Sequence, residues 1–155
     1  MNRKRFFSSL ATLVLIGLPL LVSGHGYRLG NITIRHPWAA PTDAVATIGT
    51  GYLVLRNKGA QDDKLLSALT EIADGAELHF SFEKGGVLKT LPTRGIAIPA
   101  GQETRLEPGG PHLLFTGLRK PLEEGQGFPL TLQFEHAGTI TVDMFVQPSA
   151  KSSIY

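Results

Sequence analysis

Cysteine is absent from this chain of 155 residues, and Met144 is the only methionine after the initiator. Without cysteine there can be no disulfide, no thiolate metal site and no cysteine nucleophile. For the same reason we expect no lipid-modified N-terminus. Any bound metal must therefore be held by His, Asp, Glu, Met or backbone groups.

Long apolar runs are also scarce, and the one clear example lies at the N-terminus. Leu10–Val22 follows a basic patch of Arg3, Lys4 and Arg5, and Val22-Ser23-Gly24 offers small residues for cleavage. The run is too short for a comfortable membrane span, which needs about 20 residues. The pattern predicts a signal peptide over residues 1–24, export to the periplasm, and no membrane insertion after cleavage.

The chain has no excess of basic residues once the predicted signal peptide is removed. The whole chain has 15 basic and 13 acidic residues, and the signal takes three basic residues with it, which leaves 12 against 13 and a net charge of −1. Nucleic-acid binding needs a dense basic face, so this class of function is not expected.

Short β-type runs separated by turn formers dominate the rest of the sequence. Amphipathic helices of useful length are absent, and 65–69 is expected to form one helical turn at most. Reversals are predicted at 57–59, 84–86, 99–101, 108–110 and 136–138, and strands at 31–35, 51–56, 130–134 and 139–146. Together they predict an all-β, antiparallel Greek-key β-sandwich over residues 25–147, followed by a flexible tail at 148–155.

Histidines are the best candidates for metal ligands, because neutral imidazole is a common ligand of copper and zinc. His79 shares a strand face with Glu77, and His112 follows the turn at 108–110. His136 is expected to be solvated in a hairpin turn, and Asp62-Asp63 to form a solvated turn. Trp38 is expected to be buried. No nucleophile motif is present, so the chain is not expected to be an enzyme.

Several segments, in order, resemble the PCu(A)C family of periplasmic copper chaperones. They are Ile34-Arg35-His36-Pro37-Trp38-Ala39, Gly51-Tyr52-Leu53-Val54-Leu55-Arg56-Asn57, Asp62-Asp63-Lys64-Leu65, Leu106-Glu107-Pro108-Gly109-Gly110-Pro111-His112-Leu113 and Leu130-Thr131-Leu132-Gln133-Phe134. The match covers nearly all of residues 30–147. The resemblance implies a cupredoxin-like sandwich that binds copper and hands it to an acceptor, such as a cytochrome oxidase subunit or its assembly factor.

The resemblance also implies a set of metal ligands, which this chain keeps only in part. The family pattern is a His, a Met eleven positions later, a His twenty-two positions after that, and a Met two further. Counted from His79, these positions hold Thr90, His112 and Leu114. Both imidazoles are therefore present, while both thioethers, which favour Cu(I), are replaced, with the Thr90 hydroxyl as a poor substitute ligand. Two imidazoles alone can hold Cu(I) in a linear site, or Cu(II) with added oxygen ligands, though more weakly. We expect an exposed site at a loop end, with His79 and His112 facing each other across one end of the sandwich.

Two other interpretations remain open. In the first, the chain has lost copper transfer and is an interaction module on the same scaffold. In the second, cleavage after Gly24 makes His25 the mature N-terminus, where its amine and imidazole together bind copper as Cu(II). An enzyme with a copper site at His25 is a further variant of that second interpretation.

Overall fold

A computed structural model describes residues 26–148 of the chain. The predicted signal peptide, His25 and residues 149–155 lie outside the described part, so the expectations that concern them stay predictions. Within residues 26–148 there is no helix long and apolar enough to cross a membrane.

The described residues form eleven β-strands and no helix. In chain order the strands are β1 (Gly26–Leu29), β2 (Ile32–Ala39), β3 (Ile48–Asn57), β4 (Asp63–Leu69), β5 (Ala73–Lys84), β6 (Val87–Pro92), β7 (Ile96–Ile98), β8 (Glu103–Leu106), β9 (Pro111–Leu118), β10 (Gly127–Phe134) and β11 (Thr139–Val146). All five predicted reversals fall at junctions between consecutive strands. The predicted strands at 51–56, 130–134 and 139–146 lie within β3, β10 and β11, and the one at 31–35 begins one residue before β2. The all-β prediction is confirmed.

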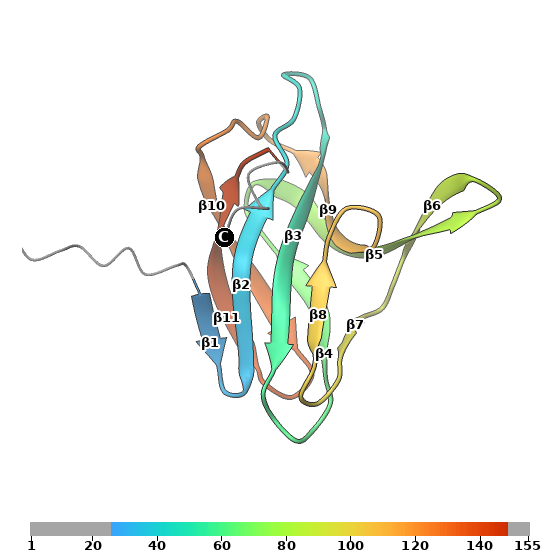
Figure 1. Ribbon diagram of the computed structural model, residues 1–155. Coiled ribbons are helices and arrows are strands. Elements are labelled where there is room, and N and C mark those ends of the chain that lie inside the picture. Colours follow the sequence, from blue (N-terminus) through green and yellow to red (C-terminus); the bar gives the residue numbers. More distant parts are fainter. Residues whose placement is uncertain (1–25, 149–155) are drawn as a thin grey trace, which may run out of the picture.

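The strands form two layers that share a single hydrogen-bonded path. The path runs β6-β5-β9-β3-β2-β11-β10-β4-β7, with β1 added beside β2 and β8 beside β3. One layer contains β1, β2, β3 and β8 on the near side of Figure 1, and β10, β11 and β4 lie behind it. All pairings are antiparallel except β2 with β11, where Trp38 aligns with Phe145 and Ala39 with Val146. The predicted antiparallel sandwich is thus correct apart from this parallel junction between the layers.

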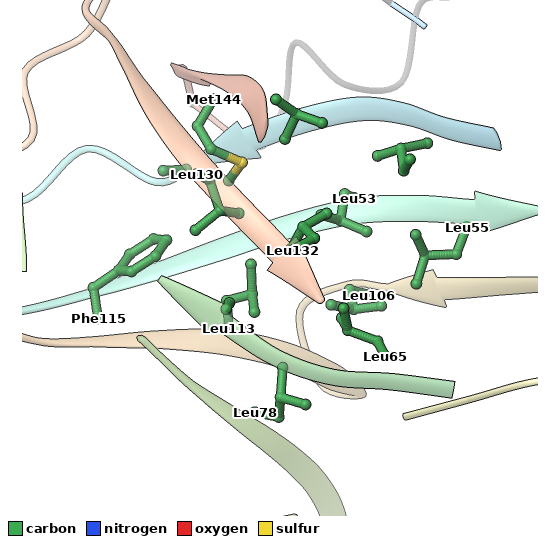
Figure 2. Packing of buried hydrophobic residues seen from close by; sticks show 14 of the residues in the cluster. Leu53, Leu55, Leu65, Leu78, Leu106, Leu113, Phe115, Leu130, Leu132 and Met144 are labelled. Carbon is green, nitrogen blue, oxygen red and sulfur yellow. The ribbon is translucent and has the colours of Figure 1, made fainter. Parts of the chain in front are cut away.

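The core forms because alternate residues of each strand point between the layers. Figure 2 shows Leu113 and Phe115 of β9 packed with Leu130 and Leu132 of β10, together with Met144 of β11. Met144 is fully buried among these groups, two residues from the equally buried Val142 on the same face of β11.

The predicted helical turn at residues 65–69 is wrong, because this segment belongs to β4. Leu65 aligns with Phe134 of β10 on one side and with Ile96 of β7 on the other. The run has too little alternation to identify a strand by itself. Pairing on both sides, which no local pattern reveals, determines its conformation.

The predicted solvated turn at Asp62-Asp63 is correct for Asp62, which is exposed, and wrong for Asp63, which is buried. The Asp63 Oδ1 atom accepts backbone hydrogen bonds from Lys64 at 2.7 Å and from His136 at 3.0 Å, and Oδ2 accepts one from Ala137 at 2.9 Å. This carboxylate fastens the start of β4 to the β10–β11 hairpin. Three charge-assisted bonds compensate for its loss of water.

Candidate metal centre

The two histidines singled out in the sequence lie side by side on adjacent strands. His79 of β5 and His112 of β9 are directly aligned in the antiparallel ladder. Their ring centroids are 5.9 Å apart and their ring planes are inclined by 37°. The residues next to them, Leu78 and Leu113, are buried in the core, so both imidazoles lie on the face of β5 and β9 that points away from the core.

This placement corrects the expected geometry. The two rings do not meet across one end of the sandwich, because they belong to neighbouring strands of the same layer. They are also not openly exposed: His79 retains 8% and His112 7% of its accessible surface. The Tyr52 ring lies 6.5 Å from that of His112, and Trp38 packs at 4.5 Å against Tyr52. Trp38 is buried as predicted.

One nitrogen of each ring is held by an acceptor that cannot itself donate. The Nε2 atom of His79 lies 2.9 Å from the carboxylate Oε2 of Glu77, and Nδ1 of His112 lies 2.9 Å from the carbonyl oxygen of Gly110. In a neutral imidazole the nitrogen that donates carries the proton. His79 therefore has its lone pair at Nδ1, and His112 has its lone pair at Nε2.

The lone pair of His79 has no hydrogen-bond donor. Its Nδ1 is buried and has no hydrogen-bond partner among the described residues. An unpartnered polar atom costs free energy when it is buried, and a metal ion is one group that satisfies it. Two rings bound to opposite sides of one ion, with metal–nitrogen bonds of about 2 Å, have centres roughly 6 Å apart. The observed separation fits that arrangement.

Thr90 and Leu114, at the two family methionine positions, flank the histidine pair. Thr90 lies on β6 opposite Ser81, and their hydroxyl oxygens are 2.7 Å apart. Leu114 lies on β9 opposite Glu77, two residues beyond His112 and therefore on the same face. The neighbours of the pair are thus a hydroxyl and a hydrocarbon, and neither favours soft Cu(I).

Nitrogen donors from His79 and His112 are the main ligands that this site offers. Within residues 26–148 no group of three or more His, Asp or Glu side chains could hold a metal ion. His136 lies far along the chain in the β10–β11 turn, with its side chain 58% exposed and 3.6 Å from Glu135, as the sequence predicted for a solvated residue. Two neutral imidazoles can hold a monovalent copper ion in a two-coordinate site.

Sequence reasoning missed the groups that cover and orient the pair. Tyr52 of β3 and the carbonyl of Gly110 come from segments that no spacing rule connects to His79. The predicted shared face of Glu77 and His79 was the one signal available, and on that face the two side chains lie 2.9 Å apart.

Comparisons with known proteins agree with this architecture. The family model described as "Putative lipoprotein LpqE-like" matches residues 32–146. A curated relative from Leifsonia xyli subsp. xyli, named "Putative lipoprotein Lxx21020", is 28% identical over 128 residues, which is 82% of this chain and 76% of the relative.

Solved structures of PCuAC domains have the same fold. The apo PCuAC domain from PmoF1 is 27% identical, with a TM-score of 0.71 over 80% of this chain and 99% of that chain. The copper-bound PCuAC domain from PmoF2 is 25% identical, with a TM-score of 0.70 over 80% of this chain and 98% of that chain.

Proposed function

Because this chain belongs to the LpqE-like family and has the fold of PCuAC domains, we propose that it binds copper through His79 and His112 and carries it to a copper-accepting protein. The observation that supports this most strongly is the aligned pair of imidazoles, each with one nitrogen fixed by a protein acceptor. Copper is the cargo of this protein, and no reaction is proposed for it.

The chemistry of the pair favours release as well as binding. Two nitrogen ligands leave an ion coordinatively unsaturated, so a ligand from an acceptor can enter before either histidine leaves. The buried position of the rings keeps water and competing ligands away until a partner docks. A copper centre of the cytochrome oxidase type, or its assembly factor, is the acceptor that the family resemblance supports.

Anaerobic titration of the metal-free protein with Cu(I), against a chromogenic chelator, tests the proposal. His79→Ala and His112→Ala are each expected to weaken Cu(I) binding by more than about a hundredfold, with each tenfold step worth about 1.4 kcal/mol. His136→Ala is the matched control, since it removes an exposed histidine and should change nothing. If the wild-type protein binds no Cu(I), the carrier proposal fails and the interaction module takes its place.

Restoring sulfur at the family positions provides a complementary measurement. Thr90→Met and Leu114→Met place thioethers beside the pair, and together they are expected to raise Cu(I) affinity at least about tenfold. Val87→Met, in the same hairpin but opposite Lys84 and on its other face, is the control. No gain from the double variant would contradict the proposed position of the ion.

The alternative site at His25 predicts a different result. Cu(II) binding would survive loss of both His79 and His112, and would disappear when one extra residue precedes His25. Mass spectrometry of the exported protein decides whether His25 is the first residue at all.

A further inference from the structure

A row of arginines covers the outer face of the layer formed by β1, β2, β3 and β8. The strand register places Arg28, Thr33, Arg56 and Glu103 in one cross-strand row, and Gly26, Arg35, Val54 and Arg105 in the next. Directly aligned residues of neighbouring strands point to the same face. Four of the six arginines between residues 26 and 148 therefore share one surface, which Figure 1 shows as the near side of the molecule.

Acidic residues do not balance this surface, which we call the arginine face (Arg28, Arg35, Arg56, Lys58 and Arg105). Glu103 is the one carboxylate within its two rows, and it contacts both Arg35 and Arg105, the latter at 2.6 Å. Glu107 lies at the border of the face. Arg56 and Lys58 are exposed, and Arg28 donates from Nε to the carbonyl of Gly30 at 3.0 Å. The segregation is notable because the mature chain has a predicted net charge of only −1.

The arginine face is hollowed on both sides of Arg35. One hollow of about 350 Å³ is lined by Thr33, Arg35, Arg56, Lys58 and Glu103. A second of about 270 Å³ lies beside Trp38 and is bordered by Arg35, His36 and Arg105. His36 lines it from a β-bulge with φ of 48°, the one positive value among the described non-glycine residues. A polar residue with such a strained backbone conformation is often found at functional sites.

Two donors in this region find no acceptor in the described part of the chain. The hydroxyl of Thr33 and the Nε of Arg35 are buried atoms without a hydrogen-bond partner among residues 26–148. The pairing of Arg35 with Glu103 uses Nη2 and leaves Nε unused. The side chains of Arg35 and Glu103 are long enough to move apart. A carboxylate from another molecule that entered between them would supply the missing acceptor and could bind the Arg35 guanidinium side-on.

We propose that the arginine face docks a partner protein through a cluster of carboxylates on that partner. Arginine forks match carboxylates in geometry as well as charge, and the hollows admit side chains rather than a flat surface. A membrane surface fits less well, because no exposed large apolar side chain lies in the two rows to enter the lipid. The proposal does not depend on copper binding, since it uses none of the residues of the histidine pair.

NMR titration of the metal-free, isotopically labelled protein with an octaglutamate peptide tests the proposal. Shifts are expected in the amides of β1, β2, β3 and β8, and they should weaken as salt is raised. Arg56→Glu with Lys58→Glu should raise the dissociation constant at least tenfold. Lys89→Glu with Arg94→Glu changes the net charge equally at sites outside the face, and should leave the dissociation constant within twofold.

Three outcomes would overturn the proposal. They are no saturable shifts on the arginine face, equal weakening by both double variants, and binding to phosphatidylglycerol vesicles without binding to the peptide. Cu(I) titration of the Arg56→Glu, Lys58→Glu variant should match the wild-type protein, which separates failure of docking from failure of copper binding.

Discussion

At the scale of single residues, the Asp63 carboxylate connects protonation to stability. Burial by itself raises its pKa, but the backbone N–H groups of His136, Lys64 and Ala137, with the charge of His136, lower the pKa below its ordinary value of 3.8. A carboxyl whose pKa is depressed by folding stabilises the folded state above its unfolded pKa. That contribution is lost as the pH falls through the folded pKa.

Asp63→Asn is therefore expected to lower the free energy of unfolding at pH 7 by about 1.5–3 kcal/mol, the range for hydrogen bonds to a charged group. Below about pH 4 the difference from the wild type should shrink, because the Asp63 carboxylate of the unfolded wild-type chain is protonated before that of the folded protein. Urea unfolding between pH 7 and pH 2.5 measures both effects.

Asp62→Asn is the matched control, since Asp62 is exposed and accepts one backbone hydrogen bond, from Ala100 at 2.8 Å. It should cost less than about 1 kcal/mol, which is typical of a single net hydrogen bond. Equal losses from the two variants at pH 7 would show that Asp63 has no special role at the β10–β11 hairpin.

The identity of the histidine pair could be predicted from the sequence, but its environment could not. The spacing of His79 and His112 resembles the family pattern, and antiparallel pairing then aligns them. Burial of the rings depends on Tyr52 and on the loop that presents the carbonyl of Gly110. Those contacts arise only when β3, β5 and β9 come together, so no local rule reveals them.

At the scale of elements, β3 requires a glycine at position 51, where it pairs with β9. A Cβ atom on Gly51 would lie 2.9 Å from Phe115 and 3.0 Å from the Met144 methyl group. Gly51→Ala is expected to destabilise the protein by about 1–3 kcal/mol, as overpacking of a filled core does. Thermal or urea unfolding measures the loss.

Gly127→Ala is the comparison, because the nearest atom to its Cβ would be the Met144 carbonyl oxygen at 3.5 Å, an ordinary contact. This variant should remain within about 0.5 kcal/mol of the wild type, as most surface substitutions do. A Gly51→Ala protein as stable as Gly127→Ala would mean that the core beside Phe115 has room to adjust.

Most elements of the fold could be predicted because turns and strands leave strong local signals. Every predicted reversal contains glycine, and the strongest strand, Gly51–Arg56, contains the unbroken aromatic and aliphatic run Tyr52–Leu55. The 65–69 segment failed because its strand character comes from pairing with β10 and β7. The parallel contact between β2 and β11 was missed for the same reason, since it joins the two ends of the domain.

At the scale of the whole molecule, copper binding and folding are thermodynamically linked. An ion that binds only the folded state stabilises it by about 2.7 kcal/mol when present at a hundred times its dissociation constant. Anaerobic calorimetry should therefore show a higher unfolding temperature with Cu(I). The rise should disappear in the His79→Ala, His112→Ala protein and persist in His136→Ala. A rise that survives in the double variant would place the ion elsewhere.

The outward placement of both imidazoles follows from the two-residue repeat of β5 and β9, and this limits how such a chain can change length. Inserting or deleting one residue between Ala76 and Phe80 of β5 would turn Leu78 toward solvent and His79 toward hydrocarbon, and the same change between Pro111 and Phe115 of β9 would do this to Leu113 and His112. Added length can be absorbed beyond Lys84, in the hairpin tip, where it leaves the ladder unaltered. Residues other than methionine can thus stand at positions 90 and 114 while His79 and His112 stay aligned. A shift of the β5–β9 register by one residue would instead place the two imidazoles on opposite faces.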